Sequence, residues 1–344
     1  MTFKPFSITL LDKVLLKNIL VIQTAFIGDA ILASAALEAL HGTFPDAKID
    51  FLVRKGNESL YANHPFLNEV LVWDKKAGKY KQLLNCLRRI RKERYDLVVN
   101  FQRFASSGFL TAFSKGKIKH GFSKNPWSFA FTKALPHELG EKGDATYIHE
   151  IDRNHSLIEE WCGPREIGPK LYPHGLSSEI KLDEEFIVIA PSSVWFTKQY
   201  PAEKWIGFLD EMTAIQVVVI GAPSDAPLGE ELIERSKHTN VVNLAGKLSL
   251  LESAALMSKA KMSYVNDSAP LHLASAVDTP VTAIFCSTIP EFGFGPSGTK
   301  GIIVQSELPL ECRPCGLHGK KVCPLGHFDC AHSITPSKLK SVLH

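Results

Sequence analysis

The chain has 344 residues, of which 45% are hydrophobic and 22% are charged, so it is long enough for two domains and apolar enough for each to bury a core. This composition excludes a disordered chain, and a formal net charge of +3 gives no sign of the strongly basic surface typical of nucleic-acid-binding proteins. No run of about 18 apolar residues occurs, and Asp12 and Lys13 interrupt the apolar N-terminus without a cleavage site after it, so we expect a cytoplasmic protein.

The first half of the sequence alternates short β-branched runs with segments of helical period. Residues 5–16 have the pattern of a short amphipathic helix, packed on its own domain or lying on a membrane surface. Gly42 is expected to end the first long helix in the C′ position. The second long helix places Tyr80, Leu83, Leu84, Leu87 and Ile90 on one apolar face. The predicted strands are 18–23, 48–53 and 96–100, and the predicted helices are 29–41 and 79–91.

The alternation weakens over residues 163–185, which are rich in Pro, Gly and charge, and then starts again. We therefore expect a domain at 1–165, a linker at 166–185 and a second domain at 186–344. The β–α alternation predicts an α/β fold with mostly parallel sheets, doubly wound by helices, and a ligand cleft at the carboxyl ends of the strands. The predicted strands of the second half are 186–190, 216–221, 241–244, 262–265 and 281–285, with helices beginning near 202, 225, 249 and 270.

The loop after the first strand contains Gly28, which permits close approach of a ligand to the backbone, and then Asp29. Asp29 either caps the following helix or presents a carboxylate to the cleft. No GxGxxG motif is present, and a carboxylate at this helix end would repel a pyrophosphate, so the loop suits activation of a hydroxyl better than binding of NAD.

Two loops of the second half carry groups that suit a diphosphate. Ser192, Ser193 and Lys198 follow a predicted strand, and hydroxyls and an ammonium group bind phosphate oxygens; the alternative is a solvated loop. Further along, the segment 266–268 (Asn-Asp-Ser) ends a buried strand, and Pro270 opens a helix whose first turn would offer free N–H groups to an anion. His272 lies in that turn, where a histidine is a ligand contact or a structural hydrogen-bonding group.

Taken together, these segments resemble the heptosyltransferases of lipopolysaccharide assembly, glycosyltransferase family 9. The similar segments are IGDAILASAALEAL, HEIDRN, KQYPAEKW, NDSAPLHLASAVDTP and CRPCGLHGKKVCPLGHFDC, in the family's order and over nearly the whole chain. The last one is most similar to the second-heptose subgroup. The resemblance implies a GT-B fold of two Rossmann-like domains that face each other across a cleft. It also implies inverting, metal-independent and cofactor-free transfer from ADP-L-glycero-D-manno-heptose to the inner core of a lipid A-linked oligosaccharide.

Matching the family's motifs residue by residue gives expected roles. Asp29 corresponds to the general base that takes the proton of the acceptor hydroxyl. Lys198 corresponds to the lysine that neutralises the diphosphate leaving group. The donor site is expected to contain Ser192, Ser193, Asp225, Asp267, Ser268 and His272.

The acceptor is expected to be a large phosphorylated amphiphile, met by basic residues of the N-terminal domain at the cytoplasmic face of the inner membrane. Gly28, Arg103 and Lys124 are the candidates for acceptor binding. Two departures from the family, Ala269 in place of Gly and Phe residues in the segment 292–296 where Trp is frequent, leave two alternatives open. These are a relative that transfers a different sugar and a non-catalytic nucleotide-sugar-binding protein.

The C-terminal region holds a cysteine cluster with the spacing C-x2-C-x7-C-x6-C. Its members are Cys312, Cys315, Cys323 and Cys330. Reduced thiols that pack between helix and loop, a structural zinc site, and a redox-labile disulfide are the three interpretations. In none of these interpretations do the cysteines take part in catalysis.

Overall fold

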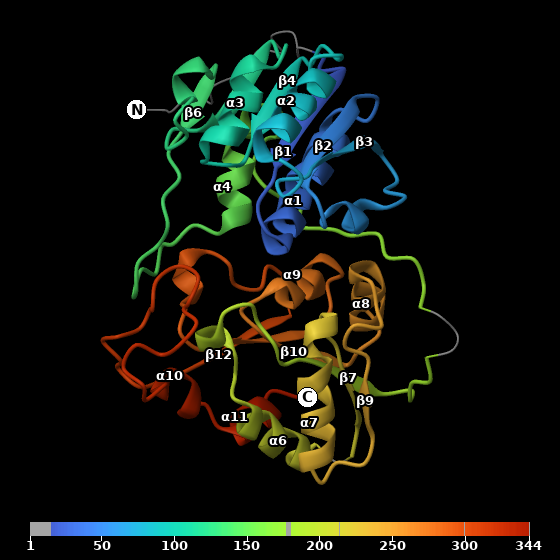
Figure 1. The fold of residues 1–344 in the computed structure, drawn as a ribbon, viewed down its shortest axis with the longest axis vertical. Helices are drawn as coiled ribbons and strands as arrows, with labels where there is room; N and C mark the ends of the chain where they lie inside the picture. The colour runs from blue at the N-terminus through green and yellow to red at the C-terminus, as the bar shows by residue number, and fades with distance from the viewer. Residues whose placement is uncertain (1–14, 177–179, 213, 299, 344) are drawn as a thin grey trace, which may run out of the picture.

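The computed structural model describes residues 15–176, 180–212, 214–298 and 300–343, and the chain folds into two lobes stacked along the long axis (Figure 1). The helix expected at 5–16 lies almost entirely outside these residues. None of the helices within them is both long and apolar enough to span a bilayer.

The N-terminal lobe is built on a parallel sheet of six strands in the order β3-β2-β1-β4-β5-β6. Its strands are β1 Asn18–Gln23, β2 Lys48–Arg54, β3 Leu67–Trp73, β4 Leu97–Asn100, β5 Ile118–Phe122 and β6 Lys133–Leu135. Its helices are α1 Ile27–Thr43, α2 Lys79–Ile90, α3 Ala105–Phe113, α4 Glu150–Ser156 and α5 Glu159–Cys162, with the 3-10 turns η1 Glu58–Tyr61 and η2 Ser128–Ala130.

The C-terminal lobe repeats this plan with the order β12-β11-β10-β7-β8-β9, again all parallel. Its strands are β7 Phe186–Ala190, β8 Gln216–Val219, β9 Val241–Asn243, β10 Met262–Asn266, β11 Val281–Phe285 and β12 Gly301–Gln305. Its helices are α6 Ala202–Glu211, α7 Ala226–Arg235, α8 Leu250–Met257, α9 Ala269–Ala276, α10 Asp329–His332 and α11 Pro336–Lys340, with η3 Phe196–Lys198, η4 Pro223–Asp225 and η5 Pro290–Phe292.

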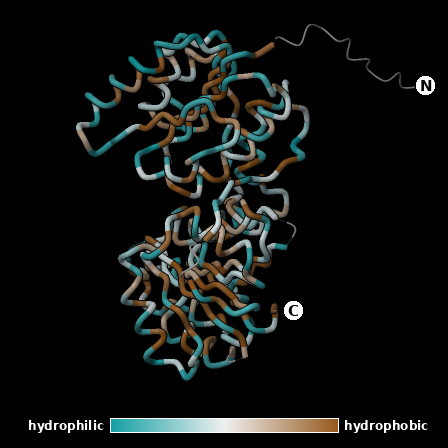
Figure 2. The backbone as a smooth tube through the Cα atoms, turned by 90° about the vertical axis from the view of Figure 1, so that its right-hand side faces the viewer, coloured by the Kyte–Doolittle hydropathy of each residue, from teal (hydrophilic) through white to brown (hydrophobic). Residues whose placement is uncertain are grey.

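The expected GT-B architecture is confirmed. In each lobe the strand order reverses at the first strand, between β1 and β4 in one and between β7 and β10 in the other, and ligands bind at such reversals. The central strands are buried on both faces, so they are continuous apolar runs such as FIVIA in β7. Figure 2 shows that hydrophobic residues are concentrated in the interior of the lobes.

The strands absent from the prediction are mostly edge strands. β3, β6 and β12 each lie at a sheet edge, where one side stays open and the sequence need not be uniformly apolar. β5 is interior but short, and Lys, His and Gly break its pattern.

Two details of the predicted helices are wrong. The first helix begins at Ile27 and runs through Gly42 to Thr43, because Phe44, which is buried, fixes the exit of the chain instead of a glycine turn. In α2 only Leu83 and Ile90 of the expected apolar face are buried, whereas Tyr80 and Leu84 are 75% and 45% exposed.

Candidate active site

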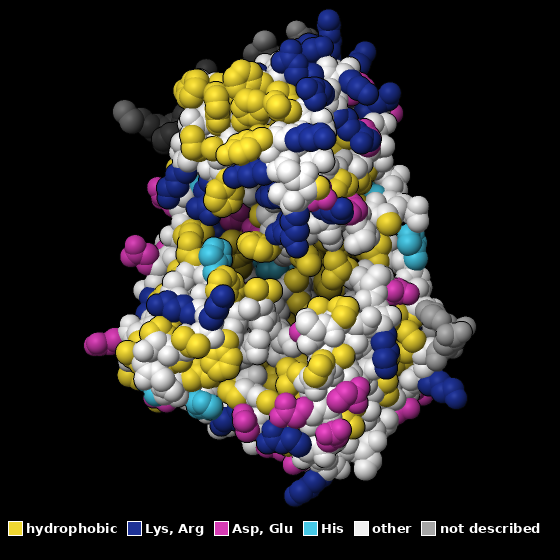
Figure 3. All heavy atoms as spheres, viewed as in Figure 1, with side chains coloured by type: hydrophobic (Ala, Val, Ile, Leu, Met, Phe, Trp, Pro, Cys, Tyr) yellow, Lys and Arg dark blue, Asp and Glu magenta, His cyan; other side chains and the backbone are white. Residues whose placement is uncertain are grey.

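Four loops that follow the strands at the two reversals converge between the lobes. They come after β1, β4, β7 and β10, and carry Asp29, Arg103, Lys198 and Asp267 respectively. Figure 3 shows a hollow between the lobes at this level, with Lys and Arg side chains along its upper rim. The topology therefore brings two carboxylates and two cations to one cleft.

The two lobes touch at Gly28. A Cβ atom built on Gly28 would lie 2.6 Å from Cδ2 of His272, so the missing side chain is what allows α1 and α9 to approach this closely. The contact places the first loop of one lobe directly on the first turn of α9 in the other. Acceptor binding by Gly28 stays a prediction.

Asp29 is the third residue of α1 and is half-buried at the cleft. Burial is the main cause that raises its pKa, and the negative charge of Glu150 raises it further, to about 7. Backbone N–H groups at Asp29 and Phe26 and the positive charge of Arg103 oppose this rise. The carboxyl can therefore gain or lose a proton near neutral pH, as a general base must.

Glu150 belongs to a buried charged group that the sequence did not assign a role. Its Oε2 atom lies 2.8 Å from Nε of Arg153 and 3.1 Å from Nε2 of His137. Burial alone would raise the pKa of Glu150, but the hydrogen bond from His137 and the charge of Arg153 hold it below its ordinary value. Arg153 also donates to the carbonyl of Phe292 at 2.8 Å and so ties α4 to the other lobe. The only signal for this group was the HEIDRN motif.

Lys198 is held by a buried ion pair on the C-terminal lobe's side of the cleft. Its Nζ atom lies 2.7 Å from Oδ2 of Asp267, and the hydroxyl of Thr288 donates to the same oxygen at 2.6 Å. Both charged side chains are largely buried, which strengthens the pairing. Thr288 is a further residue that the motifs did not reveal.

Asn266, directly before Asp267, joins the two donor loops. Its Nδ2 donates to the carbonyl of Pro191 at 2.7 Å, and its Oδ1 accepts from the backbone N–H of Tyr200 at 2.9 Å. The loop that carries Ser192 and Ser193 is thereby fixed at the end of β10. The amide is fully buried, so these bonds are not exchanged for water.

His272 is only 5% exposed, and its Nδ1 atom has no hydrogen-bond partner among the described residues. Burial is the main cause that lowers its pKa, to about 4. The negative charge of Asp267 raises this pKa, and the positive charges of His149 and Lys198 lower it further. The ring is therefore neutral. A buried, unpaired nitrogen in the first turn of α9 is a group that a ligand oxygen would satisfy.

The remaining predicted residues are Ser268 and Asp225 of the donor site and Lys124 of the acceptor site. Ser268 directly precedes α9, and its hydroxyl donates to the carbonyl of Asn266 at 3.3 Å. Asp225 accepts from the backbone N–H of Ala222 at 2.8 Å and so closes its own loop after β8. Lys124 is exposed in the turn after β5.

Basic side chains that the sequence did not single out lie beside the first loop. Lys75 donates to the carbonyl of Thr24 at 2.6 Å, and the guanidinium of Arg54 lies 5.2 Å from the centre of the Phe26 ring. Burial, then the charge of Arg54, lower the pKa of Lys75 to about 8. The N-terminal lobe's side of the cleft thus carries more positive charge than Arg103 alone.

The four cysteines lie in one region as free thiols. The Sγ atom of Cys312 is 3.9 Å from Nε2 of His327. Among the residues that the structure describes, no group of three or more His, Cys, Asp or Glu side chains is arranged to hold a metal ion.

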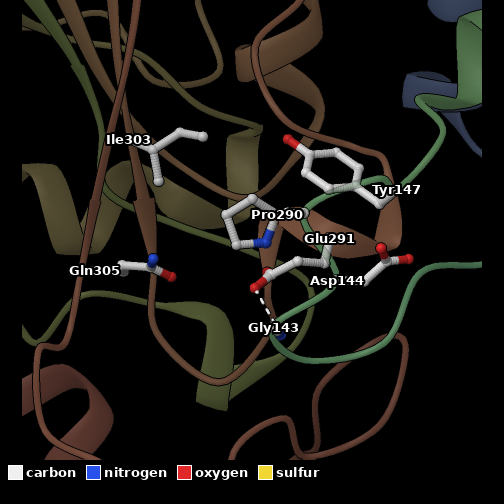
Figure 4. A pocket seen from close by; sticks show the side chains of 8 residues that line it. Gly143, Asp144, Tyr147, Pro290, Glu291, Ile303 and Gln305 are labelled. Carbon is white, nitrogen blue, oxygen red and sulfur yellow. Dashed lines mark hydrogen bonds between the residues drawn. The ribbon is translucent and has the colours of Figure 1, made fainter.

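A separate cavity of about 370 Å³ lies where the strap 143–147 crosses onto the C-terminal lobe. Glu291 and Gln305 line it from the C-terminal lobe, and the backbone N–H of Gly143 donates to Oε1 of Glu291 at 3.2 Å (Figure 4). None of the predicted site residues lines this cavity, so it is not the cleft described above.

Comparison with known proteins gives a family match. Residues 83–325 match the family described as glycosyltransferase family 9 (heptosyltransferase), which is more than half of the chain. A curated relative, lipopolysaccharide heptosyltransferase 3 of Escherichia coli, is 24% identical over 283 residues, covering 76% of this chain and 82% of that protein.

Two solved structures share the fold over nearly the whole chain. The family 9 glycosyl transferase from Veillonella parvula superposes with a TM-score of 0.77 at 20% identity, covering 95% of this chain and 97% of that one. The E. coli ADP-heptose lps heptosyltransferase II gives a TM-score of 0.75 at 18% identity, covering 95% and 98%.

Proposed function

The chain belongs to glycosyltransferase family 9 and is a glycosyltransferase, and from this premise we propose that it moves a heptose from ADP-L-glycero-D-manno-heptose to the inner core of lipopolysaccharide, with inversion and without a metal. One observation carries the proposal. Asp29 from one lobe and the Lys198–Asp267 pair from the other flank the contact between Gly28 and His272 in a single cleft.

On the acceptor side Asp29 would act as the general base. Its carboxylate takes the proton of the acceptor hydroxyl while that oxygen attacks the anomeric carbon from the face opposite the leaving diphosphate, which inverts the configuration. A pKa of about 7 gives a base that is substantially ionised at neutral pH and still basic enough to accept the proton.

On the donor side the leaving group is ADP, whose terminal phosphate gains charge as the glycosidic bond breaks. Lys198, already held at the cleft by Asp267, would neutralise that charge. The first turn of α9 adds N–H groups, and the unpaired nitrogen of His272 adds a hydrogen bond. These groups supply the role that a metal has in other transferases, so the chemistry needs no cofactor.

The acceptor would be lipid-linked, and the enzyme would work at the cytoplasmic face of the inner membrane. Support comes from the surface of the N-terminal lobe, where Phe104, Phe113 and Phe129 are 62%, 42% and 81% exposed. Figure 3 shows hydrophobic side chains gathered there next to Lys and Arg. Arg103, Arg54 and Lys75 would meet acceptor phosphates nearer the cleft.

Two finer assignments belong to the same proposal. The cysteine-rich segment favours the second-heptose subgroup, while Ala269 and the Phe residues near 292 define the alternative, a relative with a different donor sugar. A non-catalytic binding protein is the less favoured reading, because such a protein has no need for a base with a pKa near 7 opposite a buried diphosphate clamp.

Donor turnover tests the proposal. The protein, Asp29→Asn and the exposed control Asp46→Asn are each incubated with ADP-heptose and a heptose-deficient lipid A-core acceptor, following ADP release and product mass. We expect one added heptose for the parent and the control, and at least a 100-fold lower rate for Asp29→Asn with ADP binding retained. Binding of ADP-heptose without transfer by the parent would refute the donor or acceptor, and a panel of other nucleotide sugars would then be tested.

A further inference from the structure

The cysteine-rich segment, residues 312–330, makes hydrogen bonds to the proposed donor site. Arg313, 7% exposed, donates to the carbonyls of Cys286 and Thr288 at 2.7 Å each, just beyond the end of β11. Thr288 is the residue whose hydroxyl binds Asp267. The guanidinium therefore anchors the segment 312–323 to the same sheet edge that carries the Lys198–Asp267 pair.

From this anchor the segment runs along the loop that holds Lys198. The backbone of Thr197 donates to the carbonyl of Lys320 at 3.1 Å, and the backbone N–H of Lys320 donates to Oγ1 of Thr197 at 2.8 Å. Ser287 completes the junction, because its hydroxyl donates to Oγ1 of Thr197 at 2.9 Å and its carbonyl accepts from the N–H of Cys315 at 2.9 Å.

The turn at Gly319 lies directly on the stem of Lys198. A Cβ atom built on Gly319 would be 2.9 Å from Cγ of Lys198 and 3.0 Å from Oγ1 of Thr197. Burial, then the charges of Lys198 and Arg103, lower the pKa of the neighbouring His318. A lysine has a long flexible stem, and a surface along that stem limits where its ammonium group can lie.

We propose that the turn Gly319–Lys320 is a positioning element of the donor site. The turn packs against the aliphatic part of the Lys198 side chain and thereby fixes its ammonium group where the terminal phosphate of ADP binds. The proposal rests on the proposed function, in which Lys198 holds the diphosphate. It gives the cysteine-rich segment a task in donor binding that does not require the cysteines to be linked to each other or to a metal.

Gly319→Ala tests the proposal, with Gly316→Ala as its matched control. Both glycines lie in this segment with positive φ, +74° and +85°, so both substitutions carry the same backbone strain. A Cβ on Gly316 meets nothing within 4 Å, whereas one on Gly319 displaces Lys198. The difference between the two variants therefore isolates the contact with the lysine.

The readout is the affinity for ADP compared with AMP, measured by calorimetry on the full chain. AMP lacks the terminal phosphate, so a displaced Lys198 should weaken ADP binding about 10-fold while AMP binding stays within about 2-fold, in line with the loss of one charge-assisted contact. Gly316→Ala should keep the parent's preference for ADP. Equal losses for ADP and AMP in Gly319→Ala, or an unchanged ADP affinity, would overturn the inference.

Thr197→Val is a second variant that avoids backbone strain. It removes the acceptor of the Lys320 N–H and Ser287 hydroxyl bonds while keeping the volume, and it should weaken ADP selectively by about 3-fold to 10-fold. A parent protein that binds AMP as tightly as ADP would refute the assignment of Lys198 to the diphosphate itself. That outcome would count against the proposed function. A parent that prefers ADP, together with a Gly319→Ala variant of unchanged ADP affinity, would instead count against the positioning role alone.

Discussion

At the scale of single residues, the proposed role of Asp29 as the general base predicts how activity depends on pH. Its carboxyl has a pKa near 7, and the base must be ionised, so kcat/KM should fall about 10-fold per pH unit below that value and level off above it. Because Glu150 raises the pKa of Asp29 and Arg103 lowers it, Glu150→Gln should move the acidic limb of the pH profile of kcat/KM to lower pH, and Arg103→Ala should move it to higher pH. A limb that both variants leave in place would mean that another group controls it.

The same carboxyl should make the folded protein less stable at high pH. Its folded pKa of about 7 exceeds the ordinary 3.8, so the folded state prefers the protonated form and loses stability as pH rises from about 4 to 7. Asn cannot ionise, and Asp29→Asn should therefore be more stable than the parent by about 2 kcal/mol at pH 8 and nearly equal to it at pH 4. Urea unfolding at both pH values measures this. Equal stability at pH 8 would contradict the burial of the charge.

At the scale of elements, the close contact of α1 and α9 depends on Gly28. Gly28→Ala would place a Cβ 2.6 Å from the His272 ring and force the two helices apart, so transfer should fall at least 10-fold while each lobe stays folded. Gly42→Ala is the control, since it lies on the same helix with nothing within 4 Å. Alanine there should preserve activity and add about 0.5–1 kcal/mol of stability. Full activity of Gly28→Ala would show that the contact is not required.

The sequence predicted the elements that are buried and regular. β1, β4, β7 and β10 are continuous apolar runs, so both strand reversals and the four loops beyond them could be located. Asp29, Lys198, Asp267 and His272 follow those strands, which is why their convergence was predictable.

The remaining parts of the site depend on contacts between segments that are far apart in the sequence. Thr288 and Arg313 are recognisable only from what they touch, namely Asp267 and the carbonyls beyond β11. Glu150 acts on Asp29 through space from α4, which packs against α1, and no spacing rule connects the two. Edge strands escaped prediction because their open side allows a sequence that is not uniformly apolar. The exit of α1 escaped prediction because the burial of Phe44, not local propensity, sets it.

At the scale of the whole molecule, the small net charge conceals an asymmetry between the lobes. Residues 1–165 carry 24 Lys and Arg against 17 Asp and Glu, whereas the rest of the chain carries 15 against 19. The stretch 97–137, which includes the exposed Phe104, Phe113 and Phe129, has no acidic residue at all. Aromatic rings beside positive charge are the features that bind an anionic lipid surface.

The aromatic rings on this surface form a connected group. The Phe113 and Trp127 ring centres are 5.2 Å apart, and those of Trp127 and Phe129 are 5.9 Å apart. Arg91 donates to the carbonyl of Phe113 at 2.9 Å, so a cation lies at the border of the aromatic group. A bilayer in contact with this face would present a lipid-linked acceptor to the N-terminal lobe, on which Asp29 lies.

Vesicle binding tests this orientation. The protein should float with vesicles containing phosphatidylglycerol at low ionic strength, and much less with neutral vesicles or in about 0.5 M salt, because screening removes the attraction. Phe113→Ser with Phe129→Ser should weaken binding about 10-fold, whereas Leu325→Ser, which removes an apolar side chain 63% exposed on the other lobe, should not. With a delipidated acceptor the double variant should turn over normally, since its effect lies in reaching the membrane. Loss of that activity as well would assign the rings to the fold and remove the case for a membrane face.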